Sequence, residues 1–490
     1  MVGGILQSRS SRAPPLLRSS HVATTDLPPG ADAGGEQRPP TQHELTAEDA
    51  RSVRGAEGED GPIHDEARGL TAEDAEDAFL DGDRQYEPGT ARSALSHRSF
   101  RVFFFGAFAS NIGTWMQNAV LGAYAYDVTG SPSFVGLLVF AQLGPLLIFS
   151  TVGGVLADEV DRRVLLIGVA VQQLLFSIAL ALTTGGDDPN RVLLFTLVLI
   201  IGIGQAIHAP AYSSLLPQLV PKDDLAGAVA LNSTQMNASR VIGPTIGSAI
   251  YAAIGVSWVF GINALTYVAV IVSVMMTVIP AVVPSDGPKG LRRLVSGFGI
   301  ARRDSVVARC LITMALFSFF CLPFVTQMPV LAHDNLGIDP DSVAYGALYA
   351  CLGVGAVLGS LSIGTVFSKI SKRRIVCWGL VGFAASVAVL ALLRVPGIAY
   401  PTTVVVGFAY FATVTSLATV LQQDLDDAVR GRVMALWIMS FGGTVPIGGL
   451  VFGPVVEATS ITLVMLAGAL VALLLGLESF RARRPRLQAT

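Results

Sequence analysis

From Arg101 onward, the chain consists almost wholly of apolar stretches of about twenty residues, separated by short breaks. A helix of that length spans the hydrocarbon core of a bilayer, because each residue adds about 1.5 Å. Only 14% of the residues are charged, against about a quarter in a soluble protein. We therefore predict an all-α integral membrane protein with twelve transmembrane helices. The predicted spans are 102–126, 133–156, 164–183, 192–216, 225–253, 258–281, 307–331, 342–366, 374–394, 400–422, 431–456 and 459–478.

The segment between the second and third predicted spans has the pattern Gly-x-Leu-Ala-Asp-x-x-x-Arg-Arg over residues 154–163. A weaker copy lies 210 residues further on, and the same shift places Gly136 on Gly346. The corresponding loop residues are Gly154 and Gly364, Arg162 and Lys372, and Arg163 and Arg373. A repeat of this length in an apolar chain indicates two duplicated halves of six helices each.

This loop resembles the signature loop of the major facilitator superfamily of secondary transporters. The alternative is an ordinary cytoplasmic turn, since such turns retain Lys and Arg during insertion. That alternative does not account for Asp158 at the end of an apolar helix, where the negative end of the helix dipole disfavours an acid. The resemblance implies two pseudo-symmetric six-helix bundles that rock against each other. It also implies a conformational lock at Gly154, Asp158, Arg162, Arg163, Gly364, Lys372 and Arg373.

The two ends and the middle of the chain differ from the apolar spans. Residues 1–98 are rich in Pro, Gly, Ser and acids, which predicts a disordered acidic tail. Residues 99–281 and 305–478 are the two predicted bundles, and 479–490 form a basic tail. The linker 282–304 is predicted to hold an amphipathic helix, because Leu291, Leu294, Val295 and Phe298 recur at helical spacing.

Lys and Arg concentrate in the loops on one side, and the loops on the other side hold only Arg191 and Arg394. This asymmetry predicts cytoplasmic termini and a location in the cell (inner) membrane.

Polar side chains inside the predicted spans recur on single helix faces, which indicates a polar cavity between the halves. Taken one at a time, such residues also serve as hydrogen bonds between helices, and that alternative stays open. The cavity candidates are Asn111, Thr114, Asn118, Gln142, Gln205, His208, Tyr212, Asn232, Gln235, Arg240 and Gln327.

Arg240 lies near the middle of the fifth predicted span, where a cation is costly unless it faces a polar interior. We expect it to face the cavity on the same helix face as Asn232, Gln235 and Ser239. The alternative is that Arg240 reaches the interface region or ties two helices together. Pro244 and small residues at helical spacing predict close packing in the fifth and eleventh spans. These packing residues are Gly243, Pro244, Gly247, Gly449 and Gly453.

Segments 219–225, 230–232, 240–244 and 430–434 resemble the exporter group that includes macrolide efflux pumps, enterobactin-type exporters and transmembrane secretion effectors. The resemblance implies export of a small amphiphilic compound, such as a drug, siderophore or secondary metabolite, by alternating access with proton antiport. Uptake by substrate–proton symport is the alternative, and a membrane sensor is a further one.

Patterns typical of enzymes are absent from the sequence, including HExxH, GxSxG and GxxxxGK[ST]. The four cysteines have no paired spacing. We therefore expect neither enzymatic activity nor a cofactor or metal. The expected partners are a small-molecule substrate, protons and the lipid bilayer, without nucleic acid, and the expected state is a monomer.

Overall fold

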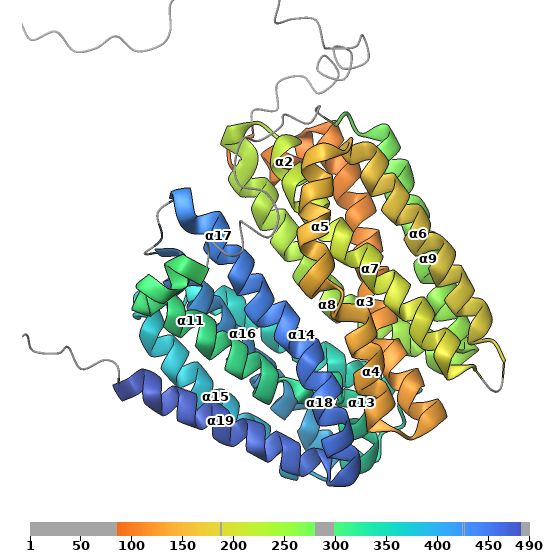
Figure 1. Ribbon diagram of the computed structural model, residues 1–490, viewed down its shortest axis with the longest axis vertical. Helices are drawn as coiled ribbons and strands as arrows, with labels where there is room; N and C mark the ends of the chain where they lie inside the picture. The colour runs from red at the N-terminus through yellow and green to blue at the C-terminus, as the bar shows by residue number, and fades with distance from the viewer. Residues whose placement is uncertain (1–85, 187–188, 280–297, 424, 426, 482–490) are drawn as a thin grey trace, which may run out of the picture. The chain divides into compact units, whose positions relative to one another are not determined.

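The computed structural model describes residues 86–186, 189–279, 298–423, 425 and 427–481, and within these ranges the regular structure is helical (Figure 1). The first group of α-helices is α2 (Ala91–Ser96), α3 (Arg98–Thr129), α4 (Pro132–Leu143), α5 (Leu146–Glu159), α6 (Arg162–Thr183), α7 (Arg191–Leu215), α8 (Leu225–Ile254) and α9 (Val256–Met276). The second group is α11 (Ser305–Leu316), α12 (Pro323–Thr326), α13 (Met328–Val330), α14 (Val343–Gly364), α15 (Lys372–Leu392), α16 (Pro396–Gln423), α17 (Asp427–Ile438), α18 (Thr444–Ala458) and α19 (Ile461–Arg481). The predicted amphipathic helix at 291–298 falls almost wholly outside the described residues.

Nine helical segments in the described part are long and apolar enough to cross a membrane. The helices α3 and α8 are longer than all of these nine, but their apolar character is diluted by polar side chains such as Gln117 and Asn237. Helix α11 continues only to Cys321 as a short apolar helix. A spanning helix that carries polar residues turns them away from lipid, so the polar faces of α3 and α8 are expected to face other helices or a site.

Several predicted spans are interrupted. The span 133–156 is divided into α4 and α5 at Gly144 and Pro145, where proline cannot donate the backbone hydrogen bond that would continue the helix. The span 307–331 is wrong as a single helix, because the π-helical segment η4 (Phe317–Cys321) and the short helices α12 and α13 replace its second part. The π-helical segment η6 (Met439–Gly443) likewise separates α17 from α18. Such π segments often occur at functional sites.

The beginnings of the second and eighth spans also differ from each other. Ser131 caps α4, with its hydroxyl accepting a 3.3 Å hydrogen bond from the Phe134 N–H, and Pro132 is the first helical residue. Asp339 and Pro340 do not start the eighth span in the same way. Asp339 instead accepts a bond from Ser342 N at 3.1 Å in a turn, and Ser342 caps α14.

The helices pack mainly within two groups, and two pairs connect the groups. In the first group α3 lies against α8 and α9, and α6 against α7 and α9. In the second, α14 and α15 lie against α16, and α15 also against α19. Between the groups α8 lies beside α14 and α4 beside α18, as Figure 1 shows.

The residues paired by the sequence repeat occupy equivalent places in these two contacts. A Cβ at Gly136 would lie 2.2 Å from the Gly449 carbonyl oxygen on α18. A Cβ at Gly346 would lie 2.5 Å from the Ser248 Cβ on α8. Both positions therefore need glycine for the helices to approach, which is the usual role of small residues between membrane helices.

The last residues of the predicted disordered tail are folded, so that prediction is wrong for residues 91–96, which form α2. Thr90 caps this helix by accepting a bond from Ser93 N at 3.2 Å. The Asp224 carboxylate, just before α8, accepts bonds from Gly89 N at 2.9 Å and contacts His97 Nε2 at 2.7 Å. A Cβ at Gly227 would lie 2.2 Å from the Thr90 carbonyl oxygen, so α8 holds the segment closely.

The Asp224 carboxylate is nearly buried, with 6% of the residue exposed. Its contact with His97, followed by bonds from Ser93 and Gly89, lowers the pKa of Asp224 to about 2. Hydrogen bonds to the charged form favour ionisation. The carboxylate is therefore the anchor by which the start of the folded chain is fixed to α8.

Candidate functional site

Three polar side chains form a hydrogen-bonded cluster between α7 and α8. The Tyr212 hydroxyl donates to Asn232 Oδ1 at 2.7 Å. Gln235 Nε2 donates both to the Tyr212 oxygen and to Asn232 Oδ1, each at 2.8 Å. Asn232 and Gln235 are one helical turn apart on α8, so both reach Tyr212. The structure thus brings together three of the predicted cavity residues.

Arg240 lies on α8 between the two groups of helices. Its guanidinium carbon is 5.3 Å from the ring centroid of Trp115 on α3 and 4.8 Å from that of Phe411 on α16. Its Nη1 donates to Asn237 Oδ1 at 3.3 Å. A guanidinium over aromatic faces is stabilised by about 2 kcal/mol or more when water is excluded. Arg240 therefore joins α3 and α8 to α16 through aromatic contacts.

The surroundings of Arg240 differ from the expected ones. The sequence predicted Asn232, Gln235 and Ser239 beside it, whereas Asn232 and Gln235 bond to Tyr212 and Asn237 bonds to the guanidinium. Asn237 precedes Arg240 by three residues, a spacing that puts the two side chains on one helix face. This three-residue spacing could have identified Asn237 from the sequence as a neighbour of Arg240. Nothing in the sequence indicated Phe411, because its contact depends on how the two groups of helices meet.

Some buried polar atoms of α8 have no hydrogen-bond partner within the described part of the chain. They are Gln235 Oε1, Ser239 Oγ, Arg240 Nε and Ser248 Oγ. Buried polar atoms are normally paired, because an unpaired one costs about 1–3 kcal/mol. Gln235 Oε1 can accept a hydrogen bond, whereas Ser239 Oγ and Arg240 Nε can donate one, so a guest at these three atoms would need both donor and acceptor groups.

The remaining cavity candidates fall into separate places. Gln142 Nε2 on α4 donates to Asn118 Oδ1 on α3. The Thr114 and Tyr267 hydroxyls are 3.5 Å apart. The His208 ring stacks on Tyr212 with centroids 5.6 Å apart, so it adjoins the Tyr212 cluster. Asn111 and Gln205 are half-buried.

Gln327 is the cavity candidate whose place differs most from the expectation. It is fully buried, and its Nε2 donates to the Pro132 carbonyl oxygen at 3.0 Å. The prediction that Gln327 lines an open cavity is therefore wrong in this structure. Its contact joins the two groups of helices instead, because Pro132 begins α4 and Gln327 lies between α12 and α13.

A buried amide network in the first group was not among the predicted site residues. Gln117 Oε1 accepts a bond from Asn263 Nδ2 at 2.7 Å and one from the Ser177 hydroxyl at 3.4 Å. Gln117 and Asn263 are 2% and 0% exposed. The network ties α3, α6 and α9 together, which is the role of polar pairs between membrane helices.

The residues predicted to form a lock lie at helix ends, where they contact their own group of helices. Arg162 begins α6, is buried, and donates to Gln218 Oε1. Arg163 Nη2 donates to the Thr277 carbonyl oxygen at 2.6 Å. Lys372 Nζ donates to the Ile363 carbonyl oxygen at 2.8 Å.

The other lock residues are less fully described. Gly364 ends α14, and Arg373 is exposed in the first turn of α15. Gly154 and Asp158 lie in α5, and the Asp158 side chain is outside the described part. Asp161, which is not among the predicted lock residues, caps α6 by accepting bonds from Arg163 N and Val164 N.

The predicted packing residues lie at helix contacts. A Cβ at Gly243 would lie 2.7 Å from Trp115 Cβ and 2.8 Å from the Ile112 carbonyl oxygen on α3. A Cβ at Gly247 would lie 2.5 Å from Met116 Cγ. On α18, Gly449 faces Gly136, and a Cβ at Gly453 would lie 2.8 Å from the Pro132 carbonyl oxygen. Pro244 is buried inside α8.

The contacts between the two groups include several hydrogen bonds near one end of the molecule. The Tyr126 hydroxyl donates to Asp334 Oδ1 at 2.7 Å. Glu457 Oε2 accepts from the Ser131 hydroxyl at 3.1 Å and from Ser133 N at 3.2 Å. Tyr126, Ser131 and Ser133 lie at or just after the C-terminal end of α3. Arg162 and Lys372 lie at the opposite end of the adjacent helices.

Comparison with known proteins gives consistent results. A family model described as transmembrane secretion effector matches residues 89–490. The enterobactin exporter EntS of Escherichia coli O1:K1 / APEC is 26% identical over 410 residues, covering 81% of this chain and 96% of that protein. EntS of Shigella boydii serotype 4 (strain Sb227) has the same identity and coverage.

Solved structures share the fold. A mutant of the nucleoside transporter NupG has a TM-score of 0.67 at 12% identity, covering 79% of this chain and all of that one. A POT family transporter has a TM-score of 0.63 at 14% identity, covering 78% of this chain and 96% of that one. The chain is thus a multi-pass membrane protein, and it belongs to the transmembrane secretion effector family, a group of major facilitator superfamily transporters rather than enzymes.

Proposed function

We propose that this protein exports a small amphiphilic compound across the cell membrane by alternating access, coupled to inward movement of protons. In this proposal twelve spans form two six-helix bundles, with α4 and α5 together making one span and α17, η6 and α18 another. Both termini are cytoplasmic, because the basic loops lie on that side. The protein works as a monomer, with one path between its bundles.

The observation that carries the proposal is the polar face of α8 beside the junction of the bundles. It presents the Arg240 guanidinium and the unpartnered polar atoms of Gln235 and Ser239. A central binding site at the bundle interface is where transporters of this architecture hold substrate. Trp115 and Phe411 add apolar surface next to the cation, so the site suits a molecule with an aromatic or apolar body and an anionic group.

The hydrogen bonds between bundles support a conformation that is open to the cytoplasm. In the proposed orientation the bonds of Tyr126, Ser131 and Glu457 lie at the outer end and close it. Arg162 and Lys372, at the cytoplasmic end, bond within their own bundles. Alternation then requires the outer bonds to break as the cytoplasmic ends meet.

The relatives support the class of substrate. The two EntS proteins are named as exporters of enterobactin, and we extend from that name to siderophores, drugs or secondary metabolites. His208, stacked on Tyr212, is our candidate for the proton-carrying group.

The test begins with an efflux-deficient cell that expresses this chain and is grown on a panel of antibiotics, siderophores and dyes. We expect resistance to at least one amphiphilic compound. That compound is then followed in membrane vesicles of defined orientation. Accumulation in inside-out vesicles that depends on an acidic interior supports export by proton antiport. Accumulation only in right-side-out vesicles with an inward proton gradient shows symport and overturns the proposal.

A further inference from the structure

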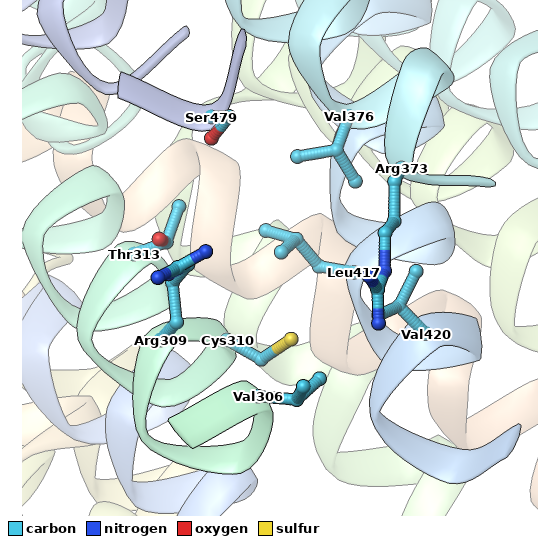
Figure 2. A pocket seen from close by; sticks show the side chains of 9 residues that line it. All are labelled: Val306, Arg309, Cys310, Thr313, Arg373, Val376, Leu417, Val420 and Ser479. Atoms are coloured by element: carbon cyan, nitrogen blue, oxygen red, sulfur yellow. The ribbon is translucent and has the colours of Figure 1, made fainter. Parts of the chain in front are cut away.

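A small cavity lies among α11, α15, α16 and α19, and its lining residues do not include any of α8 (Figure 2). Its volume is about 100 Å³. The lining is mostly apolar and includes two arginines, and its residues are Val306, Arg309, Cys310, Thr313, Arg373, Val376, Leu417, Val420 and Ser479. From this cavity we propose a binding site for the phosphate group of an anionic phospholipid.

The arrangement of the lining follows from helix periodicity. Val306, Cys310 and Thr313 recur at spacings of four and three residues on α11, so they form one face. Arg373 and Val376 on α15, and Leu417 and Val420 on α16, are each separated by three residues. Figure 2 shows Arg309 and Arg373 on opposite sides of the cavity, with Leu417 between them in the view. Two guanidinium groups therefore flank an apolar floor.

The chemistry of this lining selects an anion that also carries apolar groups. Arginine donates hydrogen bonds in a planar fork that matches phosphate. The valine and leucine side chains beside the arginines favour methylene groups over a fully hydrated ion. Basic pockets between membrane helices bind the headgroups of anionic lipids, and this cavity likewise lies between helices and carries two arginines.

The size of the cavity excludes a whole drug-sized molecule, whose pockets measure about 300–1,000 Å³. At about 100 Å³ it holds one headgroup fragment, and the rest of the ligand must lie outside. A phospholipid meets this requirement, because its acyl chains remain in the bilayer beside the helices. Leu473, Leu474 and Leu477 on α19 are 36%, 56% and 48% exposed and offer an apolar surface near Ser479.

Charge near the cavity supports the same ligand. Arg302 and Arg303 precede α11 and are exposed, and Arg374 is exposed beside Arg373. An anionic membrane surface attracts such clusters. Arg309 is itself exposed, so a substitution there removes a charge without opening the protein core.

The test uses the purified full chain and native mass spectrometry with phosphatidylglycerol or phosphatidylcholine added at equal concentrations. We expect one phosphatidylglycerol to be retained more strongly than phosphatidylcholine. Arg309→Gln should weaken that retention about tenfold, the loss expected when a charged hydrogen bond to the phosphate is removed. Arg374→Gln is the matched control, since Arg374 is a neighbouring exposed arginine outside the lining, and it should change retention less than twofold, within the effect of general surface charge.

Two further variants separate charge from shape. Val420→Phe keeps both arginines and fills part of the cavity. It should also weaken the retention of phosphatidylglycerol. Arg309→Lys should retain part of the preference, because it keeps the charge and loses the fork. Equal retention of the two lipids by the unsubstituted chain, or equal losses in Arg309→Gln and Arg374→Gln, would overturn the site. Displacement of the lipid by inorganic phosphate would assign the cavity to a free anion and would overturn the lipid as its ligand.

Discussion

Two charged residues, Arg240 and Asp224, are stabilised inside the folded protein by different kinds of neighbour. Arg240 is placed between aromatic rings and an asparagine, which stabilise a cation inside the membrane. Asp224 is placed at a helix start among hydrogen-bond donors, which stabilise an anion. The aromatic rings beside Arg240 and the donors around Asp224 come from distant parts of the chain, whereas Asn237 is only three residues from Arg240.

We expect Arg240→Ala to lower transport of the compound found in the growth panel by about tenfold or more. The reason is that a hydrogen bond to a charged group contributes about 1.5–3 kcal/mol. Arg240→Lys should retain part of the activity, because it keeps the charge but not the planar contact with Trp115 and Phe411. Transport in proteoliposomes measures both, with circular dichroism to show that each variant folds. Normal transport by Arg240→Ala would contradict the proposed role, and misfolding of both variants would show that Arg240 only ties helices together.

For Asp224 we expect α2 to detach in acid. Its pKa is lowered from about 4 to about 2 in the folded chain, so the carboxylate contributes stability that is complete above pH of about 4 and is lost as the pH falls toward about 2. A nitroxide on Ala91→Cys should be immobile at neutral pH and become mobile over that acid range. This label goes to an exposed position, whereas Cys310, Cys321 and Cys377 are buried and Cys351 is half-buried.

The control for this experiment is Asp224→Asn, which removes the ionisable group. The label should then be mobile at neutral pH and should not respond to acid. A label that stays immobile in Asp224→Asn would show that the packing of Thr90 on Gly227, rather than the carboxylate, holds α2.

At the scale of elements, glycine decides how closely the helices approach. Gly243 and Gly247 allow α8 to lie on α3, and Gly136 and Gly346 allow the contacts between the two groups. Other helix glycines have open space around them, among them Gly168 on α6 and Gly261 on α9. The effect of replacing glycine by alanine should differ between these two kinds of position. Where there is open space, alanine should stabilise the helix, because it is the better helix former.

We therefore expect Gly243→Ala to destabilise the protein by about 1–3 kcal/mol, the usual cost of overpacking. The added methyl would meet backbone atoms of Ile112 and Met116, which cannot move aside as a flexible side-chain end can. Gly261→Ala is the matched control and should be neutral or stabilising by up to about 1 kcal/mol. Thermal unfolding in detergent compares the two. Equal midpoints would show that α8 and α3 are not in this close contact.

At the scale of the whole molecule, transport requires that the contacts between the groups be exchanged. The bonds of Tyr126, Gln327 and Glu457 join the groups near one end. The charged residues at the other end, Arg162 and Lys372, bond inside their groups. In the proposed cycle these charges change partners when the cytoplasmic ends approach.

Arg162→Ala should therefore slow turnover about tenfold, the loss expected on removing a charged hydrogen bond, while leaving equilibrium substrate binding nearly unchanged. Gln218→Ala, which removes its partner in this conformation, tests whether that one bond is what matters. Turnover is measured in proteoliposomes and binding in detergent with the same compound. An equal loss of binding would place Arg162 among substrate contacts and contradict the lock.

The sequence by itself determined the membrane location, the run of apolar helices and the internal repeat, because each depends only on residue type and spacing along the chain. The partners of Arg240, the bond from Gln327 to Pro132 and the cavity beside Arg309 were decided by the tertiary structure. The physical reason is that apolar periodicity fixes which face of a helix is buried, whereas the identity of the neighbouring side chain depends on how helices far apart in sequence are packed.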